Sequence, residues 1–378
     1  MRYFVEPAGT NTGNISTSHW NTPGAVPGYL DATLSHILAS SPTNGDEIWA
    51  LHGTYSFGRP LVINQNPAPL SIYGGFAGWE TYLCQRNANI NSLQFLTDFF
   101  QNPSILDGGN RNRVIEMQQA NVCLIDGFVI QNGDAGTGNG GGVYASGQNL
   151  RFENLVFMDN RAGNNGGGMY TGVRNVMIKN TIFFNNQATD GGGICVSDSS
   201  NTLLVNLLFN ENQAAGNGNA IFTMGYFGVK IINNTISGNI GGSSDVYCLP
   251  TTAMSSMEIY NSIIYPDRLA AATVPPFPNV RVEHCLLGVF PAPPIAFPVP
   301  PNLPIGTVPN FVNMAPLPAG NYRLQAASPC IDAGNTNLIF PFSATDLEGE
   351  PRFIDKGMSP PLPSFIIGVI DMGAFEVQ

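Results

Sequence analysis

The 378-residue chain carries little charge. Only 11% of its residues are Asp, Glu, Lys or Arg, against roughly 25% in a typical globular domain. Basic residues are the scarcer kind, 15 against 26 acidic ones, which gives a formal net charge of −11. Nucleic acids and anionic membrane surfaces would be repelled by this charge, so we expect neither as a partner.

Long apolar runs and closely paired cysteines are also missing. No run approaches the roughly 20 residues that cross a bilayer, so we expect no membrane insertion in this segment. The opening MRYFVEPAGT has no basic or apolar stretch typical of a signal peptide, and we expect that an export signal has been removed.

The six cysteines show no C-x-x-C spacing, which disfavours zinc and redox motifs. We interpret them as small buried hydrophobic residues, with one or two disulfides as the alternative.

A period of about 26 residues runs through the middle third of the chain. Aligning its repeats places Asn in two columns, and the second column lies six residues upstream of the first. A third column is glycine, at Gly142, Gly168 and Gly193, with Ala220 in the next repeat. The first column contains Asn132, Asn160, Asn186, Asn212 and Asn239, and the second contains Asp126, Asn154, Asn180, Asn206, Asn233 and Asn261.

The repeats predict an all-β right-handed parallel β-helix. Short apolar stretches such as 155–157 and 182–183 separate the Asn columns, and one coil alone cannot bury them. Coils stacked about 4.8 Å apart would align equivalent residues in a continuous core. Each Asn amide would then donate to the amide one coil away and form a ladder. A calcium-binding roll is the disfavoured alternative, because its repeat is nine residues long.

Both ends of the chain depart from the repeat. Leu30, Leu34, Ile37 and Leu38 have helical spacing and predict a short amphipathic helix that covers the open end of the coils. Fourteen prolines lie between Pro266 and Pro318, where regular coils should fade. We therefore predict one domain, with an N-terminal cap and first strand at 1–60, coils at 61–288 and a Pro-rich C-terminal segment and cap at 289–378.

The sequence contains no strong catalytic set. The set of N-x-D, D-D and G-H-G motifs of polygalacturonase-like hydrolases is not present, because the chain has no D-D and no G-H-G, and no cofactor or metal site is indicated. Asp159 and Glu211 are weak catalytic candidates, because each precedes the Asn of its coil and they would share a column two coils apart. That separation of about 9.6 Å is the outer limit for an inverting carboxylate pair. The alternative interpretation is a solvated polar column.

The same region has the pattern of a binding surface. Two polar columns with a repeating spacing could bind a repetitive polymer, and they contain Asp159, Asn185 and Glu211, and Arg161, Gln187 and Gln213. Tyr144 and Tyr170 follow the glycines of consecutive coils. Outward-pointing rings would form a platform for sugars. We expect them to point inward, because Ile194 and Ile221 occupy neighbouring positions in the next coils.

The repeats GGGVY…FENLVFMDN and GGGMY…IKNTIFFNN resemble those of polymorphic outer-membrane proteins and other bacterial surface β-helix proteins. The ending NYRLQAASPCIDAGN…DLEGEPR…IDMGAFE is similar to that of choice-of-anchor Q surface proteins of Bacteroidetes-type bacteria. The resemblance implies an exported, adhesin-like protein, displayed extracellularly or on the outer-membrane surface. We expect a monomer that binds an extracellular glycan or a host protein. The alternatives are a carbohydrate-active lyase or hydrolase and a structural spacer.

Overall fold

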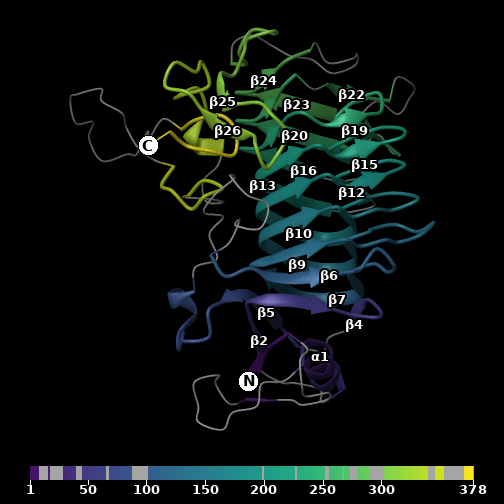
Figure 1. Ribbon diagram of the computed structural model, residues 1–378. Helices are drawn as coiled ribbons and strands as arrows, with labels where there is room; N and C mark the ends of the chain where they lie inside the picture. The colour runs from purple at the N-terminus through teal and green to yellow at the C-terminus, as the bar shows by residue number, and fades with distance from the viewer. Residues whose placement is uncertain are drawn as a thin grey trace.

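The computed structural model describes residues 1–7, 16–17, 29–39, 45–64, 68–86, 101–197, 200–225, 228–251, 255–266, 268–272, 279–289, 301–338, 345–352 and 370–377. The chain winds into a right-handed parallel β-helix, as predicted, with the N-terminus at one end of the stack (Figure 1). Each regular coil contributes to three parallel ladders of strands, which we call faces A, B and C in chain order. The described part of the chain holds no helix long and apolar enough to span a bilayer.

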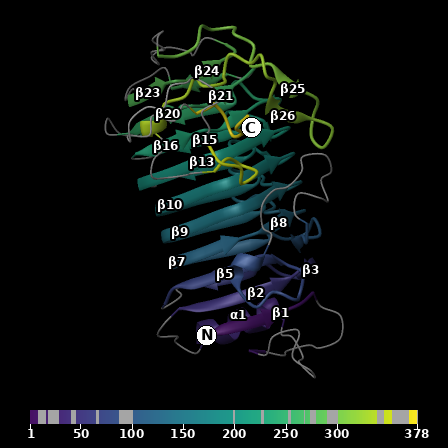
Figure 2. The same ribbon diagram turned by 90° about the vertical axis from the view of Figure 1, so that its left-hand side faces the viewer.

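Within each face, every strand pairs in parallel with the equivalent strand of the neighbouring coil. Figure 2 shows the strands of face B lying side by side. Four long strands continue around the corners: β7 (Ile115–Asp126), β9 (Val143–Met158), β10 (Met169–Phe184) and β13 (Ser200–Asn210). Face A adds β4 (Leu61–Asn64), β12 (Ile194–Ser197), β15 (Ile221–Met224), β19 (Val246–Leu249) and β22 (Leu269–Ala271). Face B adds β1 (Arg2–Val5), β2 (Asp46–Leu51), β5 (Leu70–Phe76), β16 (Val229–Ile232), β20 (Ser256–Tyr260) and β23 (Asn279–Glu283). Face C adds β3 (Gly53–Ser56), β6 (Ser104–Asp107), β8 (Phe128–Gln131), β17 (Thr235–Ile236), β21 (Ile263–Ile264) and β24 (Leu286–Leu287).

Smaller elements complete the chain. A separate three-stranded parallel sheet contains β11 (Gln187–Ala188), β14 (Gln213–Ala214) and β18 (Ile240–Gly241), and β25 (Phe311–Asn313) pairs antiparallel with β26 (Asn321–Leu324). The helical elements are α1 (Leu30–Ala39) and the 3-10 turns η1 (Leu83–Gln85) and η2 (Thr336–Leu338). Leu30, Leu34 and Ile37 of α1 are buried in the main core, so the predicted capping helix is confirmed. Five of the six cysteines are buried, Cys84 is exposed, and no disulfide joins any two of the six.

Identical side chains stack inside the coils. Phe157, Phe183 and Phe209 occupy the same position in three consecutive coils, with ring centroids 4.7 and 4.8 Å apart and nearly parallel planes. All three are fully buried, and burying a Phe side chain contributes about 1.5–3 kcal/mol. The core therefore depends on the match between neighbouring coils rather than on any single coil.

The predicted buried Asn ladder is confirmed at the corner between faces C and A, which we call the CA corner. The side-chain amide of Asn160 donates to Asn186 Oδ1 at 3.0 Å, Asn186 donates to Asn212 at 2.9 Å, and Asn212 donates to Asn239 at 3.0 Å. The second amide hydrogen of Asn186 reaches the carbonyl of Phe157 at 3.0 Å. A buried amide needs hydrogen-bond partners within the protein. The ladder and the backbone carbonyls supply these partners without water.

Asn132 was assigned to this ladder in error. The pairing of Gln131 with Met158 places Asn132 level with Asp159, so Gly133 is the residue level with Asn160. The backbone N–H of Gly133 donates to Asn160 Oδ1 at 2.9 Å. A Cβ at Gly133 would lie 2.1 Å from the carbonyl oxygen of Gly141. Only glycine fits there, and the side chain of Asn132 bonds instead to Asp107 at 3.1 Å.

The second predicted column lies at the corner between faces B and C, the BC corner. Asn154, Asn180, Asn206, Asn233 and Asn261 all adopt positive φ there, and His284 takes the same place in the last coil. Asn and His tolerate this left-handed backbone better than most residues. Asp126 was assigned to this column in error: it pairs with Glu153, and Gly127, with a φ of 82°, is the residue level with Asn154. Asn154 still donates to Asp126 at 2.9 Å, and Asn206 donates to Asn180 at 2.9 Å.

The described C-terminal residues, 301–338, 345–352 and 370–377, form an arm that packs along the side of the last coils (Figure 1). It covers the outer side of face C, where Ile182, Leu208, Ile263 and Leu286 join Phe311 and Leu324 of the arm in one apolar cluster. The arm also bonds to the BC corner: Asn206 donates to the carbonyl of Thr345 at 2.7 Å and accepts from Arg352 at 3.0 Å. The arm thus docks on the side of the coils and also bonds to their last coil, where Asn302 accepts from the backbone N–H of Cys285 at 2.9 Å and donates to the carbonyl of Val282 at 2.8 Å.

We expect Asn186→Leu to lower the free energy of unfolding by about 1–3 kcal/mol, because the neighbouring buried amides lose their partner. Urea denaturation of the purified protein measures the loss. Gln187→Leu is the matched control, because Gln187 is the next residue and is exposed. Equal stability of the two variants would show that the ladder does not stabilise the fold.

A second prediction concerns the arm. Burial raises the pKa of Glu376 from 4.5 to about 8, although Arg352 lies near it. Folded protein therefore keeps a proton that the unfolded chain releases, so this stabilisation is full below pH 4.5 and is lost as the pH rises through 8. We expect unfolding free energy to fall between about pH 5 and 8 by up to about 1.4 kcal/mol per unit, and Glu376→Gln to flatten the slope. Urea titrations at several pH values test this, and parallel slopes would contradict it.

Candidate functional site

The structure brings the predicted polar residues of the CA corner together. Asp159, Asn185 and Glu211 share one column with φ values of 57°, 50° and 56°. Arg161, Gln187 and Gln213 form the next column through parallel pairing. All six side chains are exposed or half-buried, so these residues form a polar strip along the coil axis.

The two carboxylates of the strip are separated by an amide. Asn185 lies between Asp159 and Glu211, and its Nδ2 donates to Asp159 Oδ1 at 2.6 Å. Partial burial raises the pKa of Glu211, which is the direction a general acid needs. The bond to Asn185 engages one oxygen of Asp159, however, and places a side chain where the water of an inverting mechanism would lie. The catalytic role of the pair stays a prediction.

The prediction that Tyr144 and Tyr170 point inward is wrong. Val143 and Met169 come directly after the glycine column and take the inside positions, so the alternation of the strand turns the tyrosines outward. Their rings stack on each other with centroids 5.3 Å apart and an interplanar angle of 5°. The guanidinium of Arg113 lies 5.1 Å from the ring centroid of Tyr144. The facing ring surfaces are therefore covered, and the pair does not form the flat platform considered above.

A third Asn column, which the sequence analysis missed, lies at the corner between faces A and B, the AB corner. Asn149, Asn175 and Asn201 stand level in three consecutive coils with φ of 55–56°. Asn175 Nδ2 donates to Asn149 Oδ1 at 3.0 Å, and Asn201 Nδ2 donates to Asn175 Oδ1 at 2.9 Å. All three are exposed. The signal was present in the sequence, since these residues are spaced by 26 and 26.

This column forms one wall of a shallow groove of about 360 Å³, which we call the amide groove. Val122, Met177 and Leu203 supply its apolar surface, and the side chain of Val122 is 41% exposed. The groove runs along the coil axis, because its lining comes from the level positions of β7, β9, β10 and β13. The groove therefore combines an apolar floor with a row of Asn side-chain amides about 4.8 Å apart.

Cationic side chains flank the groove. Arg151 lines it with a side chain that is 57% exposed and pairs with Glu153. Arg174 precedes Asn175 and is exposed, with no ion pair to any other described residue. Such donors suit hydroxyl, ring-oxygen or carboxylate acceptors of a ligand. Within the described ranges, no three His, Cys, Asp or Glu side chains gather as they would around a metal ion.

The comparison with family models supports the fold. The family model described as "Right handed beta helix region" matches residues 104–265. A search of curated proteins found no match. Solved structures similar to this chain include pectate lyase Pel9A, at 14% identity over 100% of this chain and 96% of that one, with a TM-score of 0.36. A pectin methylesterase from Aspergillus niger is 13% identical over 70% of this chain and 81% of its own, with a TM-score of 0.31. At these values neither structure identifies an activity for this chain.

Because Tyr170 points outward, removing its ring should destabilise the protein less than removing a buried ring of the same coil. We expect Tyr170→Ala to cost about 1 kcal/mol, mostly the stacking with Tyr144. Phe183→Ala, in the same coil but fully buried, should cost about 3–5 kcal/mol. Chemical denaturation of both variants gives the comparison, and similar losses would mean that the Tyr170 ring contributes to stability as a core residue does.

Proposed function

We propose that this protein is a glycan-binding protein of the bacterial cell surface that holds a linear polysaccharide in the amide groove. The observation that supports it is the exposed row of Asn149, Asn175 and Asn201 along one wall. A polysaccharide repeats its hydroxyl groups along its length. A row of identical amides, repeated once per coil, offers the complementary periodic pattern.

The row retains hydrogen-bonding capacity. A side-chain amide has two N–H donors and an oxygen with two lone pairs. In the ladder the amide of Asn175 uses one donor, toward Asn149, and one lone pair, toward Asn201. One donor and one acceptor are left on an exposed side chain. The ladder bonds also fix the orientation of the amide, which reduces the entropy lost on binding.

The floor and the flanks of the groove complete the match to a sugar. Met177 and Leu203 offer apolar surface to the C–H faces of a pyranose ring. Arg151 and Arg174 add charged donors beside it. Pockets for small ligands have this general make-up, an apolar lining with a few placed polar groups.

The experiment removes an amide of the row without straining the backbone of the AB corner. Asn175→Gly deletes the amide and keeps a residue that accepts positive φ. Affinity electrophoresis in gels with a neutral β-glucan, a xylan or a polygalacturonate measures retardation of the protein. We expect at least one polymer to retard the wild type, and the variant to bind it about fivefold more weakly, because each lost hydrogen bond is worth about 1 kcal/mol.

Asn185→Gly is the matched control, because Asn185 lies in the same coil, has positive φ and is exposed on the CA strip. It should bind like the wild type. Loss of binding in this control alone would move the site to the strip of Asp159, Asn185 and Glu211. New reducing ends or unsaturated products that disappear in Glu211→Gln would support an enzyme instead. Absence of retardation by every polymer would favour the spacer.

A further inference from the structure

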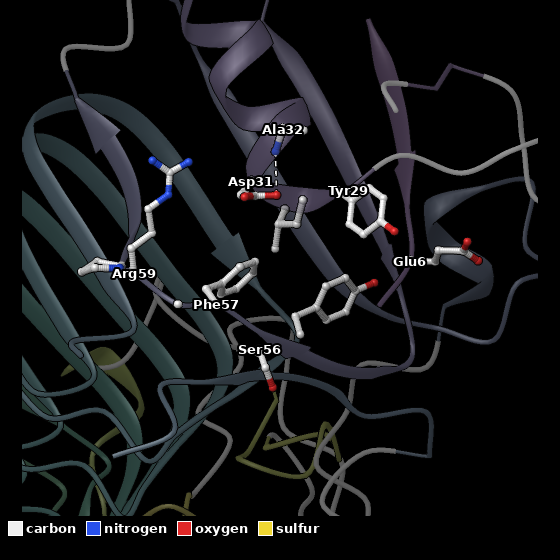
Figure 3. A pocket seen from close by; sticks show the side chains of 11 residues that line it. Glu6, Tyr29, Asp31, Ala32, Ser56, Phe57 and Arg59 are labelled. Atoms are coloured by element: carbon white, nitrogen blue, oxygen red, sulfur yellow. Dashed lines mark hydrogen bonds between the residues drawn. The ribbon is translucent and has the colours of Figure 1, made fainter. Parts of the chain in front are cut away.

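A second cavity lies at the N-terminal end of the coils, away from the amide groove. It has a volume of about 660 Å³, within the range of roughly 300–1,000 Å³ for small-molecule sites. The start of α1 forms one side, and residues 55–60, the end of β3 with its connection to β4, form another (Figure 3). The helix belongs to no coil, so this pocket has no equivalent in the next coil.

Aromatic side chains line the pocket. Tyr29, Tyr55 and Phe57 contribute to its walls. Tyr55 is 2% exposed, and its hydroxyl donates to the carbonyl of Leu51 at 2.8 Å. Burial, together with the charge of Glu6, raises the pKa of Tyr55 well above its usual value, so the hydroxyl stays protonated and this wall stays fixed. Tyr29 and Phe57 are half-buried and leave part of their surfaces to a ligand.

Three charged residues of both signs stand around these rings. Figure 3 shows Arg59 and Asp31 on facing walls and Glu6 beyond Tyr29. Asp31 Oδ1 accepts from the backbone N–H of Ala32 at 2.8 Å, which fixes the carboxylate and leaves its other oxygen. No salt bridge joins Glu6, Asp31 or Arg59 to another described residue, although Asp31 and Arg59 line the same pocket.

We propose that this pocket binds a neutral mono- or disaccharide. Hydroxyl groups both donate and accept, so one polyol between the facing walls can donate to Asp31 and accept from Arg59. The aromatic walls suit the C–H faces of a sugar ring. The three charges sum to −1, which disfavours an anionic ligand, and the guanidinium disfavours a cationic one. A neutral ligand rich in hydroxyls satisfies both Asp31 and Arg59.

Isothermal titration calorimetry of the full chain tests the proposal with glucose, galactose, mannose, N-acetylglucosamine, cellobiose and lactose. We expect one-to-one binding of at least one of them at millimolar concentration. Arg59→Ala and Asp31→Asn should each weaken it about tenfold, since hydrogen bonds to charged groups are lost. Asn at position 31 can still accept from Ala32, so the start of α1 is preserved, and thermal unfolding confirms that both variants fold.

Two controls separate this site from the amide groove. Arg111→Ala removes an exposed arginine outside the pocket and should not change binding. Asn175→Gly should bind the small sugar normally even if it loses the polysaccharide, so either site can fail alone. Absence of heat with every neutral sugar, equal binding by Arg59→Ala and wild type, or tighter binding of glucuronate or glucosamine would each overturn the proposal.

Discussion

The buried ladder of Asn160, Asn186, Asn212 and Asn239 is the interaction on which the rest of the structure depends. An amide inside the coils needs partners within the protein, and each of these finds one in the equivalent residue of a neighbouring coil. A shift of one residue between coils would leave amides unpaired and turn every strand residue to the opposite side. The ladder thus fixes the register, and the register aligns the outer residues of each face into columns.

The same residue type stands at all three corners and has a different role at each. At the CA corner the amides are buried and satisfied by one another and by the backbone. At the BC corner the column reaches outward, and Asn206 bonds to Thr345 and Arg352 of the arm. At the AB corner Asn149, Asn175 and Asn201 keep donors and acceptors exposed beside a groove. What covers each column, rather than its residue type, decides whether it supports the fold, docks the arm or is left open to a ligand.

Sequence patterns predicted features that repeat and missed those that depend on one coil. The spacing of the buried Asn residues and of Leu30, Leu34 and Ile37 was enough for the β-helix and its capping helix. The column of Asn132 was misassigned because a close backbone contact at Gly133 is invisible in an alignment. The direction of Tyr144 depends on which residue of the strand first enters the core, and hydrophobicity alone does not decide that for an amphipathic ring. The AB column was missed because exposed Asn residues carry no burial pattern.

The two proposed sites follow from this division between repeating and non-repeating chain. A surface built from level positions of successive coils can only present a repeated pattern, so its natural ligand is a polymer with a repeat of its own. A pocket needs different residues on each wall, and the coils do not supply that variety. The N-terminal end does, because α1 and the 55–60 connection bring Asp31 and Arg59 to opposite sides of one cavity. A solenoid should therefore bind long ligands along its side and small ones where its repeat is interrupted.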